Sequence, residues 1–311
     1  MRVLVTGATG FIGRAAVPAL MAHGHTVRAA VRQGAAALFH PHVEIARHGD
    51  LGDDIDWDPI VGGCDAIVHL AGIAHAGPGI AEERYDRINH RVTAALATAA
   101  ERTGAPRFIL MSSIRAQTAP AADHVLSETD VPKPADAYGA SKLAAEGALE
   151  ACSLRYTVLR PVLVYGVGVK GNLAALARLA ASPWPLPFGA LTNRRSLLSR
   201  ESLIGAIAFA LATKATERET YIVADKSALS FREIVTALRH GLGRGPGLVA
   251  IPRGLLSAAL HAVGKGDMLS RLDGELIADP SKLIAAGWTP TTDTAAALTA
   301  LAKTMIPIDR K

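Results

Sequence analysis

Short apolar runs rich in β-branched residues alternate with longer alanine-rich stretches through the first half of the chain. The short runs predict buried strands at residues 3–6, 26–31, 43–46, 66–70, 108–111 and 156–159. The longer stretches carry apolar residues at helical spacing and predict helices at residues 12–23, 82–103 and 138–151. Strands that alternate with helices indicate an α/β fold, in which a doubly wound parallel sheet is covered by helices on both faces. Such a sheet binds its ligands at the carboxyl ends of the strands.

The pattern changes after Tyr165, where glycines interrupt the chain. The proline-rich segment 182–189 excludes both a helix and a central strand. Around and beyond it, the pattern predicts one more strand at 219–224 and helices at 173–181, 231–242, 255–263 and 281–286. We therefore expect a main domain of residues 1–165, to which residues 196–225 return, and a smaller C-terminal lobe formed by residues 166–195 and 226–311.

Composition narrows the class of protein. Half of the 311 residues are apolar, which is too many for a disordered chain. The net charge of +5 is spread thinly and only 5% of the residues are aromatic, so nucleic-acid binding is not expected, although a mildly basic protein suits an anionic small ligand. No apolar run approaches the ~20 residues of a membrane helix.

Cysteine and histidine usage adds two expectations. Cys64 and Cys152 form no CxxC pair, and the chain starts without a signal peptide, which indicates a reduced, cytoplasmic protein. The 11 histidines show no spacing typical of a transition-metal site, so we expect no metal.

Three glycines follow the first predicted strand. Gly7, Gly10 and Gly13 have the spacing GxxGxxG and lead into the first predicted helix. The first glycine of such a turn permits the tight bend, the second lets backbone approach a pyrophosphate, and the third lets the helix pack closely on the strand. The start of the helix then offers N–H groups and a partial positive charge to the phosphates. The main domain is therefore predicted to bind a dinucleotide.

The end of the second predicted strand bears on which dinucleotide binds. A site for NAD(H) usually has an acidic residue there to accept a hydrogen bond from the ribose. This chain instead has Arg32, with Arg28 four residues earlier. A guanidinium binds a 2′-phosphate well, which favours NADP(H), with NAD(H) as the alternative if both arginines are solvated. Asp50, followed by Leu51 after the third strand, is either an adenine contact or a turn residue.

Acid–base chemistry is indicated further along the chain. Tyr138 and Lys142 are four residues apart on one face of a predicted helix. A nearby ammonium, together with an oxidised nicotinamide, would lower the phenol pKa from about 10 toward neutrality and make it a general acid or base. Ser113 ends the preceding strand at the ligand edge of the sheet, where its hydroxyl can hold the substrate oxygen.

With these residues in place, the chain resembles an extended short-chain dehydrogenase/reductase of the nucleotide-sugar epimerase/dehydratase family. The match runs nearly end to end and rests on Gly7, Gly10, Gly13, Asp50, Leu51, residues 69–72, Asn89, Ser113, Tyr138, Lys142 and residues 160–162. The resemblance implies a Rossmann-like fold with a tyrosine that gives or takes the proton. It further implies a lysine that holds the nicotinamide ribose and a serine that binds the reacting oxygen. These roles fall on Tyr138, Lys142 and Ser113, and Asn89 is expected to be architectural.

The resemblance also implies binding residues. Cofactor contacts are expected from Gly7, Gly10, Phe11, Ile12, Gly13, Arg32, Asp50, Leu51, Leu70, Ala71, Gly72, Lys142 and Pro161. A UDP-sugar would meet the start of a helix at Asn172 and Leu173, and the segment around Phe188 resembles the strand whose backbone reads uracil. Arg195 and Arg271 match arginines that grip a diphosphate, whereas Ser112 and His75 are expected near the sugar. A homodimer through helices 82–103 and 138–151 is implied as well.

One departure from the family refines the expected reaction. After Ser113 the chain reads Ile-Arg-Ala-Gln-Thr where the family often has Val-Tyr-Gly, and this resembles bacterial enzymes that act on 4-keto-6-deoxy-hexosamine nucleotides. With Arg32, it favours reduction of a UDP-4-keto-6-deoxy-(N-acetyl)hexosamine. The alternative is a 4-epimerase of a UDP-hexose or UDP-N-acetylhexosamine with tightly bound NAD. A non-catalytic dinucleotide sensor is disfavoured because Tyr138 is retained, and a dehydratase because no acidic pair follows Ser113.

Overall fold

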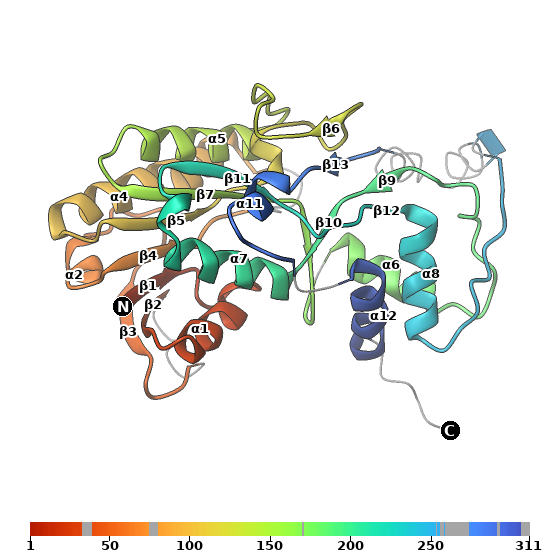
Figure 1. Cartoon of the computed structure of the whole chain (residues 1–311), viewed down its shortest axis with the longest axis horizontal. Coiled ribbons are helices and arrows are strands. Elements are labelled where there is room, and N and C mark those ends of the chain that lie inside the picture. Colours follow the sequence, from red (N-terminus) through yellow and green to blue (C-terminus); the bar gives the residue numbers. More distant parts are fainter. Residues whose placement is uncertain are drawn as a thin grey trace.

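The computed structural model describes residues 1–32, 39–74, 80–169, 171–252, 254–255, 258, 274–290 and 293–305. Its centre is a seven-stranded sheet in the order β11-β7-β5-β4-β1-β2-β3, in which every neighbouring pair is parallel (Figure 1). The strands are β1 (Arg2–Thr6), β2 (Thr26–Arg32), β3 (Glu44–His48), β4 (Ala66–His69), β5 (Arg107–Met111), β7 (Arg155–Pro161) and β11 (Glu219–Val223). The doubly wound, Rossmann-like fold is confirmed, and so is the return of the strand near residue 219 to the main sheet.

Helices cover both faces of this sheet, as Figure 1 shows. α1 (Gly13–Ala22) and α7 (Arg200–Ala212) lie on one face, and α4 (Val92–Thr103) and α5 (Ala137–Glu150) lie on the other, with the short α2 (Asp58–Val61) beside α4. Val3 of β1 belongs to the same buried cluster as Val17 of α1, whereas the next residue, Leu4, belongs to the cluster of Leu96 on α4. Because both faces of the inner strands are buried, β1, β4 and β5 read as nearly continuous apolar runs.

The predicted helix at 82–103 is not a uniform α-helix, which corrects the sequence prediction. α3 (Glu82–Tyr85) and α4 are joined by a π-helical segment, η2 (Asp86–Arg91). Such wider turns are rare and often occur at functional sites. Here the wider turn carries the buried Asn89, whose amide group bonds both backbone groups of Ile73 in the loop after β4.

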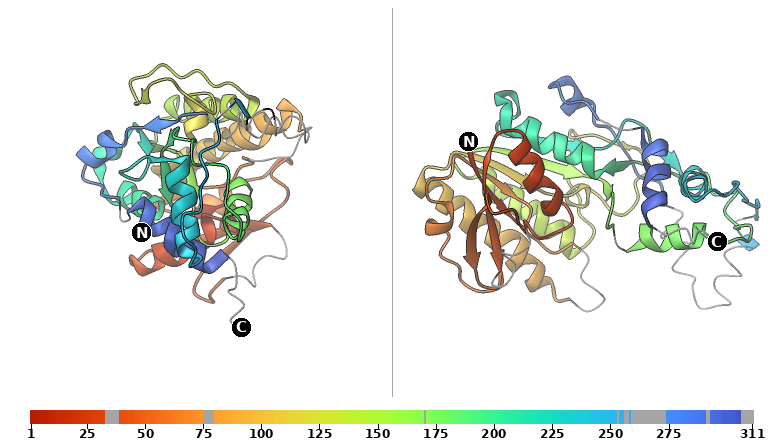
Figure 2. Two further views of the ribbon diagram at one scale, coloured as in Figure 1. Left: turned by 90° about the vertical axis from the view of Figure 1, so that its right-hand side faces the viewer. Right: turned by 90° about the horizontal axis from the view of Figure 1, so that it is seen from below.

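Three helices from the chain beyond Tyr165 form a second group at one end of the molecule (Figure 2). α6 (Asn172–Ala180), α8 (Phe231–Gly241) and α12 (Thr294–Met305) share a buried cluster that includes Leu173, Leu238 and Leu298. Short strand pairs link this group to the sheet. They are β8 (Leu163–Tyr165) with β10 (Leu197–Ser199), β9 (Arg194–Arg195) with β12 (Leu229–Ser230), and β6 (Val125–Leu126) with β13 (Ile277–Ala278). The exact division into a main domain and a lobe stays a prediction.

Several elements were not predicted. They are α2, α7, α12, the six short strands and two 3-10 turns, η3 (Ile114–Ala116) and η4 (Lys214–Thr216). The predicted helix at 281–286 corresponds to α11 (Ser281–Ala285), whereas most of the predicted helix at 255–263 lies outside the described residues. Across the part of the chain that the structure describes, no helix combines the length and the apolar character needed to cross a membrane.

Candidate active site

The turn after β1 forms the first part of the candidate site. Gly7 has a φ of +65°, and a Cβ atom on it would lie 2.6 Å from the backbone nitrogen of Ala71. A Cβ atom on Gly13 would lie 2.3 Å from the carbonyl oxygen of Gly7. The exposed Gly10 is less crowded, because among the described residues its Cβ position is near only that same oxygen, at 3.1 Å. Gly7 and Gly13 thus allow the compact turn, while Gly10 keeps its outer side open.

α1 begins at this turn without a capping side chain. Ile12 precedes the helix, and the first turn has no acidic residue. An uncapped helix start presents N–H groups and a partial positive charge, which attract phosphate groups. The open glycine turn and this helix start together fit the diphosphate of a dinucleotide. Phe11 is fixed beneath the guanidinium of Arg200, whose Cζ lies 5.1 Å from the ring centroid.

The two arginines of β2 have different surroundings. Arg32 is 72% exposed, and its guanidinium lies 3.9 Å from the Asp50 carboxylate. Arg28 instead bonds Glu44 at 3.0 Å and two backbone carbonyls, so it is not available as a second phosphate ligand. The Asp50 side chain accepts a hydrogen bond from the Gly52 backbone at 2.8 Å, which is the turn role left open by the sequence. Leu51 packs partly buried beside the α4 cluster.

The carboxyl ends of β4 and β7 complete the predicted cofactor surface. Leu70 and Ala71 lie against Gly7, and Gly72 is exposed. A Cβ atom on Gly72 would lie 2.7 Å from Asn89 Oδ1 and 3.2 Å from the Lys142 ammonium, so a side chain there would push into both. Pro161 is buried at the end of β7. The structure therefore brings the glycine turn, Gly72 and Lys142 to the same edge of the sheet.

Tyr138 stands in the first turn of α5. Asp136 caps this helix by accepting a 2.8 Å hydrogen bond from the Gly139 backbone, and it also pairs with Arg115 at 2.6 Å. The Ser113 hydroxyl bonds the Tyr138 phenol. Burial raises the pKa of Tyr138, and Asp136 adds to the rise, whereas the Ser113 bond and the Arg115 charge oppose it. The expected lowering of this pKa is thus not present in the protein alone.

Lys142 lies one helical turn beyond Tyr138 and is buried. Its ammonium donates to the Met111 carbonyl at 2.9 Å. Burial lowers the pKa of Lys142 to about 8, which the charge of Glu146 partly opposes. The buried His69 lies near this ammonium and is neutral, because burial first and Lys142 second lower its pKa to about 3. Of these two groups, Lys142 therefore carries the positive charge near neutral pH.

Ser112 differs from its neighbour Ser113. Its side chain is 3% exposed, and its hydroxyl donates to the Glu146 carboxylate inside the protein. Successive side chains of an extended segment point to opposite sides, so Ser113 bonds Tyr138 while Ser112 faces the interior. This placement contradicts the expectation that Ser112 contacts the sugar.

The predicted substrate residues are spread over the second group of helices. Asn172 is exposed at the first position of α6, whereas the Leu173 side chain is buried in the cluster of that group. Phe188 is also buried, with its ring edge against Phe231 at 5.4 Å between centroids. Leu173 and Phe188 can therefore contact a ligand through their backbone groups but not through their side chains. His75 and Arg271 lie outside the described residues.

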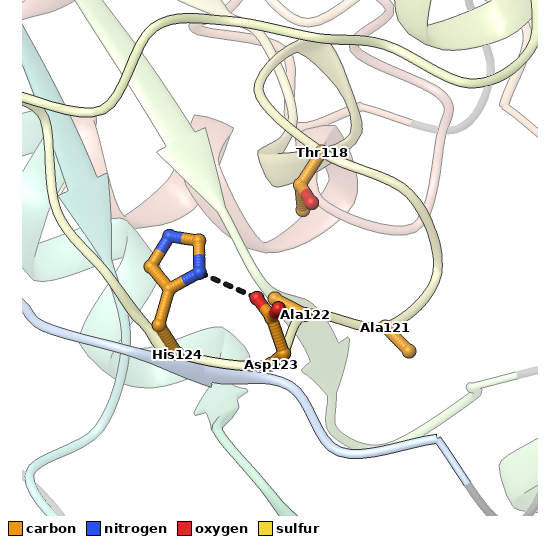
Figure 3. A pocket seen from close by; sticks show the side chains of 5 residues that line it. All are labelled: Thr118, Ala121, Ala122, Asp123 and His124. Atoms are coloured by element: carbon orange, nitrogen blue, oxygen red, sulfur yellow. Dashed lines mark hydrogen bonds and ion pairs between the residues drawn. The ribbon is translucent and has the colours of Figure 1, made fainter.

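A hollow of about 470 Å³ lies beside Arg195 and is lined by Thr118, Ala121, Ala122, Asp123 and His124 (Figure 3). Gly274 lies between this hollow and Arg195, because a Cβ atom on Gly274 would lie 2.8 Å from the Ala121 Cβ and 3.1 Å from an Arg195 nitrogen. Arg195 is half-buried on β9, and burial lowers its pKa. In Figure 3, Asp123 and His124 form a hydrogen-bonded pair at one side of the hollow, with Thr118 across from them.

Sequence reasoning missed Glu146 as a partner of the site. Tyr138, Lys142 and Glu146 recur every four residues on α5, so the spacing that identified the first two also placed the third on the same helix face. It also missed Arg115, whose guanidinium lies beside Tyr138. No local signal could show that this side chain turns toward the start of α5.

Comparisons with known proteins agree with the resemblance drawn from the sequence. The NAD dependent epimerase/dehydratase family matches residues 3–224. A UDP-glucose 4-epimerase from Vibrio cholerae is 32% identical over 299 residues, covering 93% of this chain and 90% of the relative. A ceramide reductase from Caulobacter vibrioides is 29% identical over 290 residues, covering 93% and 86%. The structure of MoeE5 in complex with UDP-glucose and NAD shares the fold, with a TM-score of 0.76 at 24% identity and 98% coverage of both chains.

Proposed function

The chain belongs to the NAD dependent epimerase/dehydratase family of enzymes, and from this premise we propose that it carries out redox chemistry at C4 of a UDP-linked sugar. The observation that supports this best is the contact between the Ser113 hydroxyl and the Tyr138 phenol, with Lys142 one turn away on the same helix. A phenol, a hydroxyl and an ammonium at the ligand edge of the sheet suit a carbinol and its ketone.

Each residue has a separate task in this proposal. A bound nicotinamide would supply the chemistry of hydride transfer at C4. The Tyr138 phenol gives a proton to the sugar oxygen, or takes it back when the reaction runs toward the ketone. Ser113 donates a hydrogen bond to that same oxygen and so fixes its position. Lys142 would hold the cofactor ribose and keep a positive charge near the phenol. The raised pKa of Tyr138 keeps the phenol protonated in the protein alone.

The leading candidate reaction is 4-epimerisation of a UDP-hexose or a UDP-N-acetylhexosamine. It is supported by the similarity of the chain, over nearly its whole length, to the Vibrio cholerae relative that is named a UDP-glucose 4-epimerase. Epimerisation begins when a phenolate takes the proton of the C4 hydroxyl and ends when the phenol returns it. The positive charge of an oxidised nicotinamide, together with Lys142, would oppose the raised pKa of Tyr138 and so permit the first step.

Reduction of a UDP-4-keto-6-deoxy-(N-acetyl)hexosamine is the second candidate. Two observations favour it: the exposed Arg32 at the end of β2, which suits the 2′-phosphate of NADPH, and Arg115, which follows the two serines and lies beside Tyr138. In either reaction we propose that Arg195 and the start of α6 at Asn172 contact the diphosphate or the sugar.

Cofactor stoichiometry separates the two candidates. Purified protein is incubated with UDP-glucose or UDP-N-acetylglucosamine and NAD, and the products are resolved by chromatography. We expect the gluco and galacto forms to interconvert without net formation of NADH. Consumption of NADPH or NADH with a UDP-4-keto-6-deoxy sugar, and no interconversion, would support the reductase instead. Absence of both reactions would refute the proposal.

A further inference from the structure

The end of β5 is bound to α5 through three consecutive residues. The Met111 carbonyl accepts from Lys142 at 2.9 Å, the Ser112 hydroxyl donates to Glu146, and the Ser113 hydroxyl bonds Tyr138. The three partners on α5 are four residues apart and therefore share one face of the helix. The middle bond, between Ser112 and Glu146, thus holds the residue next to Ser113 against the same helix face that carries Tyr138.

Glu146 also binds the neighbouring strand. Arg160 of β7 donates to its carboxylate from Nε at 3.0 Å and from Nη2 at 2.5 Å. The third guanidinium nitrogen donates to the Gln117 side chain at 2.9 Å. Glu146 and Arg160 are only 1% and 5% exposed, so neither carboxylate nor guanidinium is open to a ligand. This carboxylate consequently joins the end of β5, β7 and α5, about two helical turns beyond Tyr138.

We propose that Glu146 is a positioning residue, which acts on the reaction through Ser113 and Lys142 without touching the substrate. The inference rests on the proposed function. Truncating one partner of a buried ion pair usually destabilises a protein, whatever the function of the pair. The proposal therefore needs a measurement that distinguishes positioning and charge from stability alone.

The charges around Lys142 provide that measurement. Glu146 faces it from the same helix, the neutral His69 from β4 and the Tyr138 phenol from the preceding turn, while Arg160 is neutralised by Glu146. Glu146 is the one anion among these groups, and its charge favours the protonated ammonium. Removing that charge lowers the pKa of Lys142 further, and it leaves Arg160 as an additional repelling cation. The proton on Lys142 is then lost at a lower pH.

The test compares four variants of the full chain. Glu146→Gln removes the charge, Glu146→Asp keeps it, and Glu146→Gln/Arg160→Met removes both charges so that no cation is left unpaired. Arg107→Met is the matched control, because Arg107 is a buried guanidinium at the opposite end of β5 that bonds Thr157 and Thr216 at 2.7 Å each. Thermal stability and the pH profile of kcat are measured for all four.

We expect Glu146→Gln to lower kcat by about tenfold to 100-fold, since small misplacements of reacting groups have effects of that size. As the pH is raised above neutrality, its kcat should also begin to fall at a lower pH than the kcat of the wild type. The double variant should regain stability but keep the altered pH profile, and Glu146→Asp should return the profile toward wild type. A wild-type pH profile in both Gln-containing variants, or an equal displacement in Arg107→Met, would overturn the proposal.

A second readout needs no turnover, so it separates failure of this inference from failure of the proposed function. Urea unfolding of Glu146→Gln is compared with that of Glu146→Gln/Lys142→Met across pH, because the difference follows the protonation of Lys142 alone. The proposal predicts that this difference changes at a lower pH than it does between wild type and Lys142→Met. Coincident curves would refute it even in a protein without detectable UDP-sugar activity.

Discussion

Replacing Lys142 with methionine should remove activity and, at the same time, change how stability depends on pH. Lys142 is 6% exposed, and among the described residues its ammonium has one hydrogen bond, to the Met111 carbonyl at 2.9 Å. Methionine has a similar volume and no charge, so the substitution removes a buried cation without leaving a large cavity. Loss of the ammonium leaves the Met111 carbonyl without this donor, which costs about 1–3 kcal/mol at every pH.

The pH-dependent part follows from the pKa of Lys142, which burial lowers from 10.5 to about 8. The folded pKa lies below the unfolded one, so at pH 7 the ammonium must be held charged in the folded chain at a cost of about 3 kcal/mol, taking 1.36 kcal/mol per pKa unit. Between pH 8 and pH 10.5 the folded chain has lost this proton while the unfolded chain still binds it. The free energy of unfolding of the wild type therefore rises over that pH range, whereas that of Lys142→Met does not show this rise.

Urea unfolding of both proteins at intervals from pH 7 to pH 10 measures this effect. All other groups titrate alike in the two proteins, so the difference between their unfolding free energies isolates Lys142. We expect that difference to move in favour of the wild type by about 2–3 kcal/mol across the range. Lys226→Met, at an exposed position, is the control. A difference that stays constant with pH would show that Lys142 is not a buried charged group, and the reasoning would be refuted.

Three further predictions follow from individual contacts. Gly13→Ala should lower the free energy of unfolding by about 3 kcal/mol or more, because the new Cβ would lie 2.3 Å from the Gly7 oxygen. Gly147→Ala, with no described atom within 4 Å of its Cβ position, should raise it by about 0.5–1 kcal/mol. Urea unfolding measures both changes. Arg32→Ser should weaken NADPH binding about tenfold or more in a fluorescence titration and leave NADH binding unchanged, and equal loss of both would contradict the assigned contact. Asp136→Ala should lower the free energy of unfolding by about 1 kcal/mol, because the helix cap is lost. Because Asp136 raises the pKa of Tyr138, the substitution should also lower the pH at which the phenol titrates in an absorbance measurement. An unchanged titration would argue against that coupling.

The parts of the fold that depend on short-range pattern were predictable. Buried parallel strands read as apolar runs because both faces are covered, and this pattern predicted the inner strands of the main sheet. The edge strand β3 was also predicted, although it is only partly buried. The glycine spacing after β1 predicted the turn, because only glycine fits where a Cβ atom would meet backbone at 2.3–2.6 Å. α7 was missed for the opposite reason, since its apolar residues occur on every side and give no helical periodicity.

The side-chain contacts of the candidate site were not predictable, because they depend on which of several possible partners each side chain binds. Arg28 and Arg32 differ only in position along β2, yet the first is bound by Glu44 and the second is exposed. Ser112 and Ser113 are neighbouring serines, but because the backbone is extended their side chains point to opposite sides. Ser112 bonds Glu146, and Ser113 bonds Tyr138. The raised pKa of Tyr138 likewise depends on its burial, which neither the phenol nor its spacing from Lys142 reveals.

The phenol of Tyr138 is the group on which the proposed chemistry depends. The most direct measurement is kcat for Tyr138→Phe with whichever UDP-sugar the wild-type protein converts, alongside the dissociation constant for the dinucleotide. Loss of the hydroxyl should lower kcat by about 10²–10⁴-fold, the usual contribution of a general acid or base, while dinucleotide affinity is unchanged. A Tyr138→Phe protein that turns over at the wild-type rate would contradict the account.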